Sequence, residues 1–120
     1  MSVRSYGLVA IGGVTGAVVR YGVSLVFVGE FPWATLSVNV AGAFLLGVVV
    51  YEGLFVGGLS RESRLLASTG FLSSFTTYST FVADTAALDV RWAAVFVVAN
   101  YGLGFLAVVF GREVVRWLQA

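Results

Sequence analysis

The sequence contains no cysteine, no histidine and no lysine, and only one proline. The absence of cysteine excludes disulfides and thiol chemistry, and the absence of histidine removes a frequent metal ligand and the commonest general base. Charged residues make up only 11% of the chain, and its six acidic residues lie at the ends of apolar segments instead of in a shared cluster. We therefore predict that the chain is not an enzyme.

Long apolar segments fill the space between these few charges. Hydrophobic residues make up 59% of the 120 residues, which is more apolar surface than a small soluble core can bury. Four segments are long enough to cross about 30 Å of hydrocarbon at about 1.5 Å per residue. We predict spans near residues 5–28, 31–53, 64–88 and 91–117, so that residues 1–120 form a single four-span membrane domain.

Small residues one helical turn apart predict tight packing between these spans. Gly12 and Gly16 form such a pair in the first span, and Ala43 and Gly47 form another in the second. Pairs of this kind allow two helix backbones to approach closely inside a membrane. We expect both pairs to lie at helix–helix contacts.

Two polar side chains stand out in the first two spans. Arg20 is the only charge well inside a span, and burial at a mid-helix position would cost about 2.5–3.5 kcal/mol on insertion scales. It could reach the interface by snorkelling, or it could serve in interhelical hydrogen bonding or anion attraction. Asn39 has two amide donors, which could hold a neighbouring helix or face a passing anion. The residues alone leave these alternatives open.

The third predicted span is unusual because hydroxyl groups crowd its centre. The stretch from Gly70 to Phe81 reads G-F-L-S-S-F-T-T-Y-S-T-F and interleaves hydroxyl side chains with aromatic rings. Small polar residues of this kind favour a helix broken at mid-membrane, where non-helical backbone persists only inside protein or around an ion. The aromatic residues could line a pathway, or they could simply pack as one stripe of an unbroken helix.

Three motifs stand out in the first three spans. They are G-G-V-T-G-A-V-V-R-Y at 12–21, P-W-A-T-L-S-V-N-V-A-G at 32–42 and the stretch at 70–81. In order and spacing they resemble the motifs of the Fluc (CrcB) family of fluoride channels. The resemblance covers all four spans. It implies an all-α integral membrane protein with four transmembrane helices, the third broken at mid-membrane, that assembles as an antiparallel dimer. It also implies a passive, fluoride-selective channel in the cell membrane that exports fluoride from the cytoplasm and relieves its toxicity.

The resemblance assigns roles to individual residues. Asn39 would donate to fluoride, and Tyr78 and Phe81 would line the pore with the positive edges of their rings. Arg20 corresponds to the arginine of the family's first span. The matching hydroxyl positions are those of Ser79 and Thr80.

A structural sodium ion at the dimer centre is implied by the same resemblance. Backbone carbonyls of Ser73 and Thr76 would hold it. The family often has glycine where this chain has Ser73, and usually phenylalanine where it has Tyr78. Tyr78 therefore adds a hydroxyl to a pore position that is normally apolar. The implied partners are fluoride, the lipid bilayer and a second subunit, and no nucleic acid is expected.

The distribution of arginine predicts the orientation of the chain. With four spans both termini lie on one side, and Arg91 alone flanks the opposite side. The arginines on the side of the termini are Arg4, Arg61, Arg64, Arg112 and Arg116. The positive-inside rule then places both termini in the cytoplasm. An antiparallel dimer would need a homologous second subunit with the reverse bias, or a homodimer in which some copies insert inverted.

Two other functions fit a chain of four short spans. A proton-coupled exporter of the small multidrug-resistance type has about this length, but it relies on an acidic residue in the first span, where this chain has none. The chain could also be the partner subunit of a heterodimeric fluoride channel, with weak or no conductance alone. Tyr78 suggests this second alternative, because it adds a hydroxyl to a pore position that is normally apolar in the family.

Overall fold

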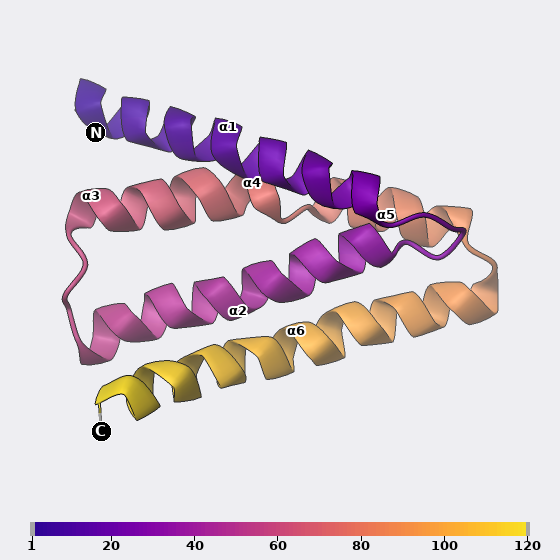
Figure 1. Ribbon diagram of the computed structural model, residues 1–120. Helices are drawn as coiled ribbons and strands as arrows, with labels where there is room; N and C mark the ends of the chain where they lie inside the picture. The colour runs from indigo at the N-terminus through magenta and orange to yellow at the C-terminus, as the bar shows by residue number, and fades with distance from the viewer. Residues whose placement is uncertain (1, 120) are drawn as a thin grey trace.

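The computed structural model describes residues 2–119, which form helices and short connections without a strand. Three helices are long and apolar enough to cross a membrane: α1 (Val3–Val26), α2 (Trp33–Phe55) and α6 (Val90–Gln119). The third predicted span is built from shorter segments (Figure 1). These are α3 (Arg61–Arg64), the π-helix η1 (Leu65–Leu72), α4 (Ser73–Phe75) and α5 (Tyr78–Ala87).

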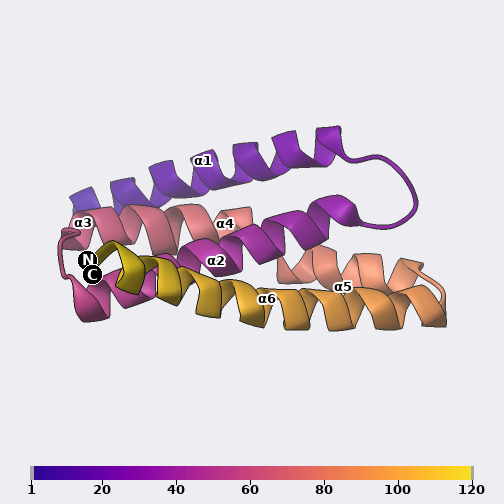
Figure 2. The ribbon, with the colours of Figure 1, turned by 60° about the horizontal axis from the view of Figure 1, so that its bottom comes forward.

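The four passes lie side by side and alternate in direction, so that α1 begins and α6 ends at the same end of the molecule (Figures 1 and 2). Helix α2 packs mainly against α6, and η1 and α4 pack against α1. The segment α5, by contrast, contacts α6. The third pass therefore changes its neighbour between α4 and α5, where its helical structure also stops.

Glycines bring α1 close to η1, so the helix–helix contact expected at Gly12 and Gly16 is present. An added Cβ at Gly12 would lie 2.8 Å from the backbone N of Phe71, and one at Gly70 would lie 2.9 Å from the Val9 carbonyl oxygen. Gly16 is equally close to the backbone between η1 and α4, since an added Cβ would lie 3.1 Å from the carbonyl carbon of Phe71. Any side chain at these positions would push the two backbones apart.

A second glycine contact joins α2 to α6. An added Cβ at Gly47 would lie 2.6 Å from the Val108 carbonyl oxygen, and one at Gly111 would lie 2.6 Å from that of Phe44. The predicted role of Gly47 is therefore confirmed. Close backbone approach of this kind lets van der Waals packing hold helices together where lipid removes the usual hydrophobic driving force.

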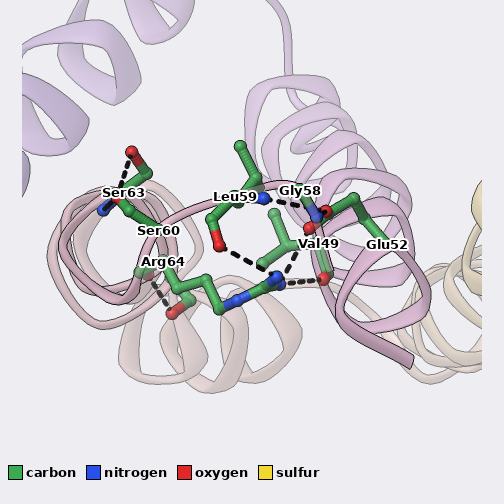
Figure 3. Close-up of polar contacts among 8 residues, drawn as sticks. Val49, Glu52, Gly58, Leu59, Ser60, Ser63 and Arg64 are labelled. Atoms are coloured by element: carbon green, nitrogen blue, oxygen red, sulfur yellow. Dashed lines mark hydrogen bonds and ion pairs between the residues drawn. The ribbon is translucent and has the colours of Figure 1, made fainter. Parts of the chain in front are cut away.

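An ion pair closes the loop between α2 and α3 (Figure 3). The Arg64 guanidinium lies 2.9 Å from one Glu52 carboxylate oxygen and donates to the carbonyls of Val49 and Leu59. The other Glu52 oxygen accepts from the backbone N–H groups of Gly58 and Leu59, at 2.6 and 3.0 Å. Arg64 thus ties the connection at Leu59 to the body of α2 at Val49 and Glu52.

Candidate functional site

The third pass loses its helical backbone at two threonines. Helix α4 ends at Phe75, Thr76 and Thr77 have extended backbone angles, and α5 begins at Tyr78. The Thr77 side chain then caps α5 by accepting from the Thr80 N–H at 3.1 Å. We call Thr76 and Thr77 the interruption. Its backbone polar groups need partners from elsewhere in the protein, because lipid offers none.

Asn39 of α2 supplies both partners for Thr77. The Asn39 Oδ1 accepts from the Thr77 N–H at 3.0 Å, and the Asn39 Nδ2 donates to the Thr77 carbonyl at 3.3 Å. A single carboxamide therefore pairs with the donor and the acceptor of one residue in the interruption. Of the roles that the sequence left open for Asn39, contact with a neighbouring segment is present in the structure.

Asn100 of α6 completes this polar group. The Asn39 Nδ2 also donates to the Asn100 Oδ1 at 3.2 Å, and the Asn100 Nδ2 donates to the Phe96 carbonyl at 2.9 Å. Sequence reasoning gave Asn100 no role. A second carboxamide in an apolar span was the available signal, since two such side chains on different helices are strong candidates to pair.

An open cavity of about 320 Å³ lies beside this polar group. Phe81 is buried, with its ring centroid 6.0 Å from that of Tyr78 and 5.9 Å from that of Tyr101. Tyr78 and Tyr101 are 72% and 64% exposed, so the cavity has an aromatic rim at the surface of the single chain. The polar and aromatic residues that line it are Asn39, Thr76, Thr77, Tyr78, Phe81, Asn100 and Tyr101.

A second cavity, of about 190 Å³, contains the positive charge of Arg20. Arg20 is half-buried and forms no ion pair with a carboxylate within residues 2–119. The serine and threonine residues that line the same space are Ser24, Thr35, Thr77 and Thr80. Because Thr77 lines both cavities, the interruption separates a basic, hydroxyl-lined space from an amide- and ring-lined one.

The structure places the predicted pore residues in different surroundings. Asn39, Tyr78 and Phe81 line the first cavity, whereas Arg20 and Thr80 line the second. The predicted residue Ser79 is exposed and lines neither of them. Phe71 and Phe75, which belong to the same sequence stripe, stack at 5.3 Å, and Phe75 is buried in a cluster with Val38 and Leu72.

The carbonyls of Ser73 and Thr76 have lost their usual helical donors. In an unbroken helix Ser73 O would accept from the Thr77 N–H, which here donates to Asn39. Thr76 O would accept from the Thr80 N–H, which here donates to the Thr77 hydroxyl. Oxygen atoms of this kind suit a hard cation. The residues that the resemblance assigned to sodium therefore offer the type of ligand that a hard cation takes.

These features define a class of protein: an α-helical, multi-pass membrane protein with polar groups at an interrupted helix. Residues 7–112 match the family model described as CrcB-like protein, Camphor Resistance (CrcB). The chain belongs to this family, as its motifs predicted.

Several relatives match almost the whole chain. The chain is 56% identical over 117 residues to Fluoride-specific ion channel FluC 1 of Natronomonas pharaonis, covering 98% of each protein. It is 54% identical to Fluoride-specific ion channel FluC 1 of Haloarcula marismortui, covering 97% of this chain and 89% of the relative. It is 46% identical to Fluoride-specific ion channel FluC 2 of Halobacterium salinarum, over 92% and 86%. Relatives named as ion channels confirm the prediction that the chain is not an enzyme.

Proposed function

We propose that the chain forms a passive, fluoride-selective channel that carries fluoride out of the cytoplasm. The observation that carries this proposal is the match along nearly its full length to relatives named fluoride-specific ion channels. The polar site supports it, because amide donors and aromatic rings surround a break in an apolar helix. The negative membrane potential would drive fluoride outward without a nucleotide or a coupling proton.

The two cavities suggest how a small, strongly hydrated anion would cross. Arg20 lines the hydroxyl-lined cavity and pairs with no carboxylate of residues 2–119, so its charge would attract anions there. Beyond the interruption, the Asn39 amide and the positive ring edges of Phe81 and Tyr78 would replace water around fluoride. Larger halides would fail to obtain the same close contacts in a narrow route.

A second subunit in antiparallel orientation would complete the site. In the single chain, Tyr78 and Tyr101 are largely exposed and the first cavity is open. A partner placed over this face would enclose the cavity and bury the aromatic rim. The carbonyls of Ser73 and Thr76, whose usual helical donors bond elsewhere, would hold a sodium ion together with those of the partner. The positive charge of this ion would attract passing anions.

The arginine distribution favours a homologous partner over a second copy of the same chain. Five arginines flank the end that carries both termini and one flanks the other end, so the chain should insert with its termini in the cytoplasm. An inverted subunit would then be a different protein. The numbers 1 and 2 in the names of the relatives are consistent with paired subunits. In that arrangement the two subunits would have different roles, and Tyr78 and Ser73 would mark this chain as the subunit that conducts weakly or not at all on its own.

Fluoride release from proteoliposomes tests the function. Vesicles loaded with potassium fluoride at neutral pH and given valinomycin should release fluoride when they contain the chain, alone or with a homologous subunit. Protein-free vesicles serve as the control for leakage of hydrofluoric acid. Comparable release of chloride would contradict the proposal, as would no fluoride release under either condition.

The same vesicles and intact cells together test the partner. Release by the chain purified alone would show that a second gene product is unnecessary. Tags on the two termini should react with an impermeant reagent only after the cells are opened. Tags accessible on both faces in similar amounts would contradict a fixed orientation and support a homodimer.

A further inference from the structure

Every hydrogen-bonding group of the Asn39 carboxamide is engaged inside the chain. Its oxygen and one N–H pair with the backbone of Thr77, which fixes the plane of the carboxamide against the interruption. Its remaining N–H points to the Asn100 Oδ1 at 3.2 Å. Asn39 therefore has no free donor for an anion unless one of these bonds is exchanged.

The bond to Asn100 is the one that can be exchanged without disturbing the interruption. Asn39 and Asn100 both line the first cavity, so their mutual bond lies along its wall. Asn100 is oriented by its own bond to the Phe96 carbonyl, at 2.9 Å, which turns its oxygen toward Asn39. Breaking the bonds to Thr77 would instead leave backbone groups of the interruption without partners.

We propose that the Asn100 Oδ1 takes the place of fluoride as a hydrogen-bond acceptor for Asn39 while the site is empty. This inference rests on the proposed function. The Asn100 oxygen holds the cavity-facing N–H of Asn39 while no anion is present and is displaced when fluoride binds. Without it, each empty site would contain an unpaired amide donor in an apolar region, which is unfavourable. Because fluoride must displace the Asn100 Oδ1, the affinity of the site for fluoride is lower, and the ion can leave quickly.

Removing the competing oxygen should tighten fluoride binding and slow release. Asn100→Leu keeps the size of the side chain but deletes the acceptor, so the fluoride concentration that gives half-maximal current should fall about two- to tenfold, the range for one neutral hydrogen bond. The maximal current should fall as well. A residue needed only for packing would lower the current without lowering the half-saturating concentration.

Two further variants separate this acceptor role of Asn100 from loss of folding. Asn100→Thr can return its hydroxyl bond to the Phe96 carbonyl, as Thr85 does to Phe81 at 2.7 Å, but its short side chain falls away from Asn39. It should shift half-saturation in the same direction as Asn100→Leu. Asn100→Asp places a charged acceptor beside Asn39, so half-saturation should rise or the current should disappear.

The measurement is channel current in planar bilayers against fluoride concentration at constant ionic strength, in the assembly that conducts. Thr15→Val is the matched control, because the Thr15 hydroxyl bonds only to the Ile11 carbonyl on an exposed face of α1. Normal fluoride current with unchanged half-saturation in both Asn100→Leu and Asn100→Thr would overturn the role of Asn100 alone. No fluoride current in the unaltered protein would overturn the proposed function and this inference with it.

Discussion

Replacing Gly12 by alanine should weaken the contact between α1 and η1, whereas the same change at Gly22 should not. A Cβ at Gly12 would lie 2.8 Å from Phe71 N and 3.0 Å from Gly70 Cα, which are backbone atoms that cannot rotate away. A Cβ at Gly22, on the same helix, would meet nothing within 4 Å. Both variants add the same methyl group to α1, but only Gly12→Ala places it against a neighbouring backbone.

The free-energy difference between these variants can be worked out from that comparison. Alanine stabilises a helix interior relative to glycine by about 0.5–1 kcal/mol, and this gain is common to both positions. Overpacking typically costs about 1–3 kcal/mol, and this cost applies only at Gly12. Gly12→Ala should therefore be about 1–3 kcal/mol less stable than Gly22→Ala.

Reversible unfolding in mixed micelles with increasing dodecyl sulfate measures this difference, at equal protein concentrations because assembly contributes to stability. Fluoride release should fall in Gly12→Ala as well, because η1 leads through α4 directly into the interruption. Equal unfolding midpoints for Gly12→Ala and Gly22→Ala would refute the packing of η1 on α1 described above.

Two further changes test separate features. Tyr78→Phe removes the exposed hydroxyl from the first cavity, so fluoride release should be retained or raised, and a dead channel would show that the hydroxyl has its own role. Arg64→Gln breaks the 2.9 Å pair with Glu52 and removes the donor to the Val49 and Leu59 carbonyls, so it should lower the midpoint in the same unfolding assay. Arg116→Gln, which alters a mostly exposed pair, should change stability by less than about 1 kcal/mol, and equal losses would contradict the importance of the Arg64 contact.

The positions of the helices could be predicted because charge marks their ends. Apolar runs with few charges gave spans near 5–28, 31–53 and 91–117, and α1, α2 and α6 begin and end within about two residues of these bounds. Close contacts at Gly12 and Gly47 were also predicted from spacing, since small residues one turn apart share a helix face.

The position of the interruption could not be predicted from the hydroxyls. Ser and Thr side chains can return hydrogen bonds to their own helix, and several here do, including Thr76 to the Leu72 carbonyl at 2.9 Å and Ser73 to the Gly70 carbonyl at 3.1 Å. What distinguishes Thr77 is its pairing with Asn39, 38 residues away. A contact of that separation leaves no trace in local periodicity.

Asn100 was missed for the same reason. Its bond to Asn39 spans 61 residues, and a lone carboxamide in the fourth span does not identify its partner. Arg20, by contrast, was visible in the sequence as a charge inside an apolar run, and the structure places it in a cavity with hydroxyls. Ser79 was assigned by resemblance alone, and it lies outside both cavities.

Selectivity for fluoride is the central claim, and the reversal potential of the current tests it most directly. Planar bilayers that contain the conducting assembly can be given opposed gradients of fluoride and chloride, so that the equilibrium potentials of the two anions have opposite signs. We predict that the current reverses at the fluoride equilibrium potential. A reversal near zero, or on the chloride side, would contradict a fluoride-selective channel.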